Sequence, residues 1–158
     1  MTKFLLTLIC AVMMVFTSYT CEAYQQNYDV RKKSNITEVQ LNSKLKGNLK
    51  GTAKYFLEAQ KTYGINAVFL AAVAMHESGN GSSRAARTKN NFFGIMEKRS
   101  LKKFNSPREC IMYTAKILTK KNGYYFGSGR FTIKKIGKKY ATCPAWSTRV
   151  IKHMKQIG

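Results

Sequence analysis

Hydrophobic and polar residues follow each other along the chain in patterns that predict several helices. After the polar stretch 24–45, the segment TAKYFLEAQKTYG (52–64) has apolar side chains at helical spacing and closes on a glycine, Gly64, which favours helix termination. Asn66 then suits the N-cap of the next helix. That helix, AVFLAAVAM (67–75), is apolar on every face, which indicates burial on all sides. We therefore expect residues 67–75 to form the central helix of the core.

Three further helices are predicted in the second half of the chain. The tetrapeptide SPRE (106–109) has the residue types of a capping box with proline at the first helical position, so a helix is expected over 107–121. Further helices are expected over FTIKKIGKKYA (131–141) and from Pro144 onward. The predicted inward-facing residues are Ile133, Ile136, Trp146, Val150, Ile151 and Met154, and the predicted solvated lysines are Lys134, Lys135, Lys138 and Lys139.

The N-terminus has the pattern of a secretory signal peptide. A lysine near the start is followed by an unbroken apolar run from Phe4 to Phe16 and by a polar stretch that ends in small residues. The apolar run is too short to span a bilayer comfortably. We expect cleavage after Ala23, with an uncleaved N-terminal anchor as the alternative. Residues 24–45 are then expected to be a loosely packed polar leader, followed by one compact domain over 46–158.

The chain is strongly basic, with 28 Lys and Arg against 7 Asp and Glu and a net charge of +21. Removal of residues 1–23 takes away one lysine and one glutamate, so the net charge is unchanged. Such a field attracts polyanions, among them nucleic acid, anionic membranes and bacterial wall polymers. Because the chain is predicted to be exported and carries no recognisable nucleic-acid-binding motif, no nucleic acid partner is expected. The sequence favours an anionic wall polymer, and a monomer is expected.

Two of the four cysteines, Cys110 and Cys143, lie outside the predicted signal peptide. An even pair in an oxidising compartment predicts a disulfide. The bond would close a loop of about thirty residues and contribute about 3 kcal/mol. The alternative is a nucleophilic cysteine paired with His76 or His153, but neither cysteine lies in a recognisable peptidase signature.

Glu77 is the candidate catalytic residue. It follows the apolar helix at its last turn, and Gly79 suits a left-handed helix cap. The negative end of the helix dipole and the apolar surroundings both favour the protonated carboxyl, as glycoside cleavage requires of a general acid. The alternatives are a solvated Glu77 and a packed His76. A zinc-protease motif is excluded because Asn80 stands where the second histidine would be. No metal or organic cofactor is implied.

The stretch YGINAVFLAAVAMHESGNGSSRAARTKNNFFGI (63–95) resembles the core of the peptidoglycan N-acetylglucosaminidases of glycoside hydrolase family 73, which include flagellar muramidases and autolysin glucosaminidases. The resemblance covers about residues 46–158. It implies a mainly α, lysozyme-like fold with a small β-lobe, which is shortened here because few residues separate Ile95 from Ser106. In that family the glutamate of the alanine-rich helix is the catalytic acid, and its match is Glu77.

The segment KNNFFGI (89–95) resembles the family's Asn-Leu-Phe-Gly-Ile segment, where the chain starts the β-lobe. The resemblance makes Asn91 a candidate to bond a sugar acetamido or hydroxyl group. Phe93 is a candidate substrate contact, with packing as the alternative for Phe92 and Phe93.

The segment KKYATCPAW (138–146) resembles the family's Tyr-Ala-Thr-Asp-Pro segment, in which the tyrosine lies near the scissile bond. Tyr140 is therefore a second functional candidate. Cys143 replaces the aspartate of that pattern, a departure that fits the predicted disulfide. In the preceding glycine-rich loop, Tyr124 and Tyr125 could stack on sugar rings, with core packing or a plain loop as the alternative.

Glycosidases ordinarily use a second carboxylate, and the candidate here is Glu97. It follows the FFGI segment, where the family's β-lobe often carries its second acid, and its alternative is a surface charge. Asp29 is the only aspartate and lies in the leader, while Glu109 is explained by helix capping. If Glu97 has no role, the 2-acetamido group of the substrate could stabilise the developing cation.

Together these features predict an exported peptidoglycan hydrolase, secreted or periplasmic and acting at the cell wall. It would cleave the β-1,4 glycan strand as an N-acetylglucosaminidase, with Glu77 as general acid. One alternative is a muramidase or lytic transglycosylase on the same polymer. The other is a cationic wall-binding or membrane-disrupting protein that acts through charge alone.

Overall fold

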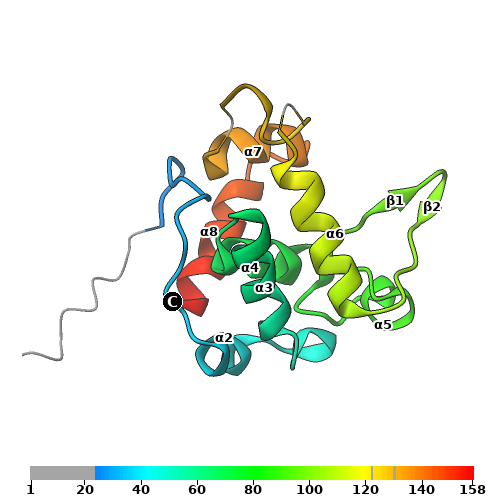
Figure 1. Cartoon of the computed structure of the whole chain (residues 1–158). Coiled ribbons are helices and arrows are strands. Elements are labelled where there is room, and N and C mark those ends of the chain that lie inside the picture. Colours follow the sequence, from blue (N-terminus) through cyan, green and yellow to red (C-terminus); the bar gives the residue numbers. More distant parts are fainter. Residues whose placement is uncertain (1–23, 122, 130) are drawn as a thin grey trace, which may run out of the picture.

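The computed structural model describes residues 24–121, 123–129 and 131–158 (Figure 1). The predicted signal peptide lies outside these residues. The described elements, in chain order, are α2 (Glu38–Lys44), η1 (Gly47–Leu49), α3 (Ala53–Tyr63), α4 (Ala67–Ser78), α5 (Arg84–Lys89), β1 (Met96–Glu97), β2 (Ser100–Leu101), α6 (Pro107–Thr119), η2 (Gly127–Gly129), α7 (Ile133–Tyr140) and α8 (Trp146–Ile157).

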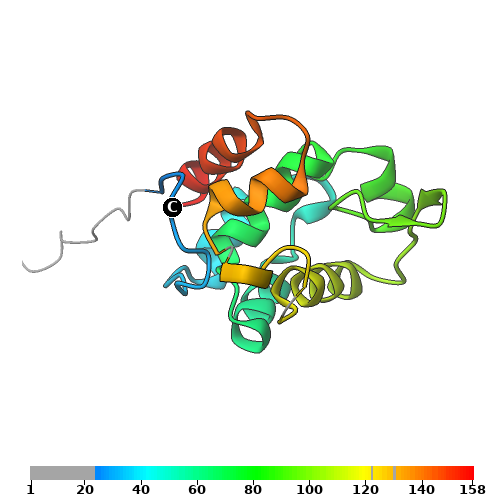
Figure 2. The same ribbon diagram turned by 90° about the horizontal axis from the view of Figure 1, so that it is seen from above.

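The central helix is α4, which is buried along its whole apolar run, residues 67–75. It packs mainly against α8 and also against α3, and it lies between α8 and α6 (Figure 2). The helix begins where predicted, because the Asn66 side chain accepts a hydrogen bond from the N–H of Phe69 at 2.9 Å. Among the described residues, no helix is both long enough and apolar enough to cross a lipid bilayer.

Residues 24–45 belong to the packed domain, and their interpretation as a loosely packed leader is wrong. Tyr28 and Val30 are buried in the core. The Val30 N–H donates to the carbonyl of Phe131 at 2.9 Å, and its carbonyl accepts from the N–H of Asn66 at 2.7 Å. These bonds join the segment to the start of α4 and to the residues before α7. The apolar residues of the segment are too widely spaced to show a helical or strand period. Their burial depends on residues far away in the sequence, which a local pattern does not reveal.

The helix α6 begins at Pro107, as predicted, and ends at Thr119. The Ser106 hydroxyl accepts a hydrogen bond from the N–H of Glu109 at 3.1 Å. The Glu109 carboxylate accepts from the N–H of Asn105 at 2.7 Å, one residue before the cap. The predicted capping box is therefore formed only in its first half, although Glu109 does serve the helix start.

The faces predicted for α7 and α8 are confirmed. The buried side chains include Ile133, Ile136, Trp146, Val150, Ile151 and Met154. The exposed lysines include Lys134, Lys135, Lys138 and Lys139.

The β-lobe is one hairpin of two short antiparallel strands, in which Glu97 is paired with Ser100 and Met96 with Leu101. The hairpin extends away from the helices, and its residues from Met96 to Ser100 are exposed (Figure 1). The predicted fold class, mainly α with a small and shortened β-lobe, is confirmed.

Cys110 and Cys143 are free thiols, so the predicted disulfide is not formed. Cys110 is buried on α6, whereas Cys143 is exposed between α7 and α8. Burial raises the pKa of the Cys110 thiol to about 12. The prediction failed because an even number of cysteines does not establish that two of them meet in the geometry that a disulfide requires.

Candidate active site

Glu77 lies in the last turn of α4, where the helix passes from the core to the surface, and its side chain is half-buried. Gly79 ends the helix in the left-handed conformation, with φ 57°, and its N–H donates to the carbonyl of Met75. The chain then passes close to η1. A Cβ at Gly81 would lie 2.8 Å from the backbone nitrogen of Leu49, so only glycine fits. The glycines after Glu77 allow the chain to leave the helix at once.

The indole of Trp146 fixes the carboxylate of Glu77. Its Nε1 donates a hydrogen bond to Glu77 Oε1 at 2.7 Å. Trp146 is the first residue of α8 and is only 3% exposed. Within the part of the chain that the structure describes, Oε2 of Glu77 has no hydrogen-bond partner. One carboxylate oxygen is therefore held while the other is available to carry a transferable proton.

Close contact between α7 and α8 positions Trp146. A Cβ on Gly137 of α7 would lie 2.9 Å from Cε3 of the indole and closer still to the hydroxyl oxygen of Ser147. That hydroxyl donates to the carbonyl of Ile133 at 3.3 Å, which adds a polar link between the two helices. Glycine at position 137 thus allows α7 and α8 to approach closely enough for the indole to reach Glu77.

Tyr140 lies beside this pair. Its ring stacks on that of Trp146, with a centroid separation of 4.9 Å and an interplanar angle of 28°. Its hydroxyl donates to the carbonyl of Phe93 at 3.2 Å. Burial, and then the nearby charge of Glu77, raise the pKa of Tyr140 well above its usual value. The phenol therefore stays neutral at physiological pH and remains a hydrogen-bond donor.

Two more tyrosines continue from Tyr140, and we call the three the tyrosine row. The ring of Tyr125 lies 5.6 Å from that of Tyr140, and the ring of Tyr124 lies 5.2 Å from that of Tyr125. Burial raises the pKa of Tyr125, whereas Tyr124 is 61% exposed. The amino group of Lys139 lies 5.2 Å from the centroid of the Tyr124 ring. The structure thus joins both predicted sugar-stacking tyrosines to Tyr140.

Asn91 and Phe93 support the base of the hairpin. The Asn91 side chain is buried, and its amide nitrogen donates to the carbonyls of Ile95 at 2.8 Å and Lys102 at 2.9 Å. Its oxygen accepts from the N–H of Ile95 at 3.0 Å. The Phe93 ring is buried, and its backbone carbonyl accepts the hydrogen bond of the Tyr140 hydroxyl. These contacts favour structural roles, so direct sugar binding by the two residues stays a prediction.

Glu97 lies on the exposed hairpin. Its carboxylate forms an ion pair with Lys102, and its side chain is 58% exposed. This hydrogen bond raises the pKa of the Lys102 ammonium. No hydrogen bond or ion pair found among the described residues joins Glu97 to Glu77 or Tyr140. The predicted role of Glu97 as the second catalytic acid stays a prediction.

The sequence predicts that Trp146 lies in the core, and it does not predict the hydrogen bond to Glu77. The available signal was its place as the only tryptophan of the chain, at the end of the segment that also holds Tyr140. As for metals, no group of three His, Cys, Asp or Glu side chains in residues 24–121, 123–129 and 131–158 could hold an ion.

The chain is a mainly helical domain with one small hairpin and an anchored, half-buried glutamate at the end of its central helix. The chain belongs to the glucosaminidase family. The family model, described as mannosyl-glycoprotein endo-beta-N-acetylglucosaminidase, matches residues 53–158. The predicted family is confirmed.

Two curated proteins of Streptococcus pneumoniae, both described as "Putative endo-beta-N-acetylglucosaminidase", are similar to this chain. The protein of serotype 4 (strain ATCC BAA-334 / TIGR4) is 33% identical over 112 residues, which cover 65% of this chain and 17% of that protein. The protein of strain ATCC BAA-255 / R6 is also 33% identical over 112 residues, with coverages of 65% and 16%. The chain thus corresponds to less than a fifth of the length of these relatives.

Solved structures of autolysins share the fold. Staphylococcus aureus autolysin E in complex with the muropeptide NAM-L-Ala-D-iGlu has a TM-score of 0.70 and 25% identity, covering 84% of this chain and 71% of that one. A catalytic mutant of autolysin E, with alanine in place of a glutamate, is bound to the disaccharide NAG-NAM. It has a TM-score of 0.72 and 26% identity, with coverages of 87% and 73%. The major bifunctional autolysin has a TM-score of 0.65 and 28% identity, with coverages of 84% and 68%.

Proposed function

We propose that this protein is a peptidoglycan hydrolase that acts at the cell wall and cleaves the β-1,4 glycan strand as an N-acetylglucosaminidase, with Glu77 as general acid. The observation that carries the proposal is the hydrogen bond that holds Glu77 to Trp146 at the end of a buried helix, in a chain of the glucosaminidase family. The autolysin E structures support it, because they contain a muropeptide and NAG-NAM and because the catalytic mutant lacks a glutamate.

In the first step, the carboxyl group of Glu77 transfers its proton to the glycosidic oxygen. The bond between C1 and that oxygen breaks, the leaving sugar departs as an alcohol, and positive charge develops at C1. Glu77 becomes a carboxylate as this happens. Its hydrogen bond from Trp146 then has a charged acceptor and becomes stronger, which stabilises the product of proton transfer more than the starting acid.

The 2-acetamido group of N-acetylglucosamine supplies the second reacting group. Its carbonyl oxygen bonds to C1 as the leaving group departs, which replaces the carboxylate nucleophile of ordinary retaining enzymes. Water then attacks C1, the acetamido oxygen is released, and the Glu77 carboxylate takes the proton of the water. This scheme suits a chain in which Glu97 is exposed and already paired with Lys102.

The tyrosine row offers a surface for the glycan beside Glu77. Tyr124 exposes much of its ring, and apolar ring faces can stack on the faces of sugars. The large positive charge of the chain also attracts it to an anionic wall and raises its local concentration there.

Digestion of purified peptidoglycan tests the proposal. The products are reduced and their ends identified by mass spectrometry. Reducing-end N-acetylglucosamine is expected. Reducing-end N-acetylmuramic acid would instead indicate a muramidase, and anhydro ends would indicate a lytic transglycosylase. Wall clearing by Glu77→Gln equal to that of the wild type would refute an enzymatic role and support a protein that acts through charge alone.

A further inference from the structure

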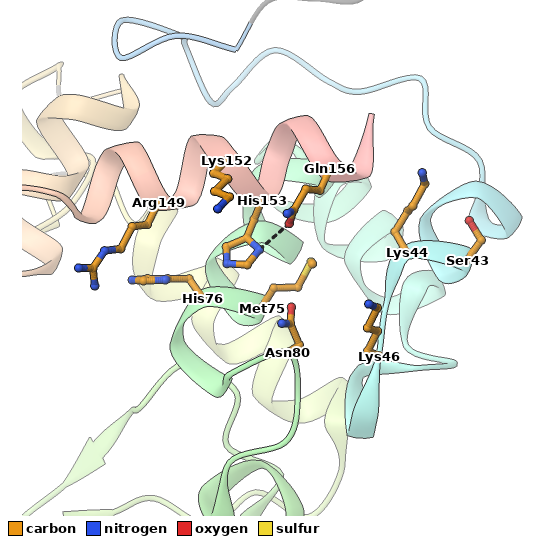
Figure 3. A pocket seen from close by; sticks show the side chains of 10 residues that line it. All are labelled: Ser43, Lys44, Lys46, Met75, His76, Asn80, Arg149, Lys152, His153 and Gln156. Atoms are coloured by element: carbon orange, nitrogen blue, oxygen red, sulfur yellow. Dashed lines mark hydrogen bonds between the residues drawn. The ribbon is translucent and has the colours of Figure 1, made fainter.

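A pocket lies near the end of α4, between α2 and α8 (Figure 3). It is a pocket of about 630 Å³, and we call it the basic pocket. Glu77, Tyr140 and Trp146 are not among the residues that line it. Its lining consists of Ser43, Lys44, Lys46, Met75, His76, Asn80, Arg149, Lys152, His153 and Gln156.

The basic pocket contains four permanent cations and no acidic side chain. The ion pairs found among the described residues, Arg31 with Asp29, Lys102 with Glu97 and Arg108 with Glu58, involve none of these cations. A hollow lined by charges of one sign concentrates the potential and attracts counter-ions. The positive charge of the pocket is thus left for a ligand to neutralise. The four cations are Lys44, Lys46, Arg149 and Lys152.

Both histidines of the chain also line the basic pocket. The rings of His76 and His153 are neighbours, with centroids 6.0 Å apart and planes tilted by 47° (Figure 3). Nδ1 of His153 lies 3.1 Å from the side-chain oxygen of Gln156. Burial, and then the charges of His76 and Lys152, lower the pKa of His153, although the bond to Gln156 opposes them. A bound anion would oppose this effect and favour the protonated form of His153.

We propose that the basic pocket binds a phosphodiester group of an anionic cell-wall polymer. Arginine, lysine and histidine from two walls of the pocket can donate to the two non-bridging oxygens of a phosphodiester, and neighbouring phosphodiesters of the same polymer can meet the remaining cations. The volume is in the range of small-molecule sites and accommodates the groups on either side of the phosphate. The choice of a wall polymer over other polyanions rests on the proposed function.

The position of the basic pocket gives the binding a consequence for the enzyme. His76 precedes Glu77 on α4, and Arg149 lies one helical turn after Trp146 on α8. The two sites therefore share both helices. A polymer held in the pocket keeps Glu77 next to glycan strands that carry that polymer, which selects where in the wall cleavage occurs.

Proton NMR of the two histidines gives a direct test, because both signals report on this pocket alone. The probe is a glycerol phosphate oligomer added to the purified protein. We expect saturable shifts of both histidine signals and a rise in the pKa of His153. The variant Lys46→Gln/Lys152→Gln should weaken binding at least tenfold. The matched variant Lys134→Gln/Lys135→Gln, which removes equal charge from the exposed face of α7, should weaken it less than twofold.

Equal weakening by the two variants, or binding without a shift of the histidine signals, would overturn the proposal in favour of diffuse attraction. Tighter binding to phosphatidylglycerol vesicles or to single-stranded DNA would overturn the choice of a wall polymer. Hydrolysis of a soluble glycan that lacks the polymer should be unchanged in Lys46→Gln/Lys152→Gln, and its loss would assign the pocket to the glycan site instead. If the protein binds the glycerol phosphate oligomer but hydrolyses no glycan, the proposed function is refuted while the proposed binding site in the basic pocket is supported.

Discussion

Glu77 and Glu97 are both partly accessible carboxylates, but the regions that carry them differ in nearly every physical respect. Glu77 ends a helix whose body is buried, and a buried indole holds one of its oxygens. Glu97 lies on a hairpin with two residues in each strand, and its carboxylate meets a lysine in solvent. The first carboxyl is fixed by the packing of three helices. The second is held by a contact that water and salt weaken.

The difference bears on the proposed role of Glu77 as a proton donor. A catalytic acid must stay in one orientation and must be partly shielded from water. Both conditions come from α4, α7 and α8 acting together, since Gly137 permits the helix contact that brings Trp146 to Glu77. The hairpin that carries Glu97 provides neither a fixed orientation nor shielding from water, because short hairpins are marginally stable and open locally at little cost.

The largest expected effect comes from making the same substitution in both regions. Glu77→Gln keeps the size of the side chain and an acceptor for Trp146 but removes the transferable proton. We expect a loss of about 10²–10⁴-fold in the release of reducing ends from peptidoglycan. Glu97→Gln should cost less than about fivefold, because an exposed ion pair contributes about 0–1 kcal/mol. A comparable loss in Glu97→Gln, with the melting temperature unchanged, would make Glu97 the second catalytic group and exclude the acetamido scheme.

Trp146→Phe tests the anchor of Glu77. The substitution keeps an aromatic ring beside Tyr140 but removes the only N–H that reaches the carboxylate in the described chain. A hydrogen bond to a charged group contributes about 1.5–3 kcal/mol, so kcat should fall about 10–100-fold. The effect should fall on kcat more than on KM, because the bond strengthens as Glu77 ionises. Unchanged kcat would show that the orientation of Glu77 does not depend on the indole.

Features of the fold that depend on neighbouring residues could be predicted from the sequence, whereas contacts between distant segments could not. The apolar run, Asn66 and Gly79 are local signals, and they predicted α4 and the position of Glu77 correctly. The bond from Trp146 joins residues 69 positions apart, and no local pattern encodes it. The packing of residues 24–45 was missed for the same reason, since their partners lie before α7 and at the start of α4.

A smaller effect is expected from Gly137→Ala, which alters the packing behind the anchor. Alanine is the better helix former by about 1 kcal/mol, so helix propensity alone predicts stabilisation. The added methyl group would instead collide with the indole and with Ser147. We expect a loss of about 1–3 kcal/mol in the free energy of unfolding, measured by urea denaturation, and reduced activity because Trp146 shifts. A more stable variant would show that α7 can move away from α8 without cost.

Lys98→Gly, in the turn of the hairpin, should have the smallest effect. Lys98 has a φ of 56°, in the left-handed region that costs a side chain about 1–2 kcal/mol and glycine little. The substitution should therefore slow amide hydrogen exchange within the hairpin. It should leave the melting temperature within about 1 °C, because the hairpin opens without the core. Glycan hydrolysis should stay within twofold if the hairpin lies outside the chemistry. A larger change in activity would mean that the hairpin conformation contributes to the reaction, so that both regions and not only the end of α4 would take part in catalysis.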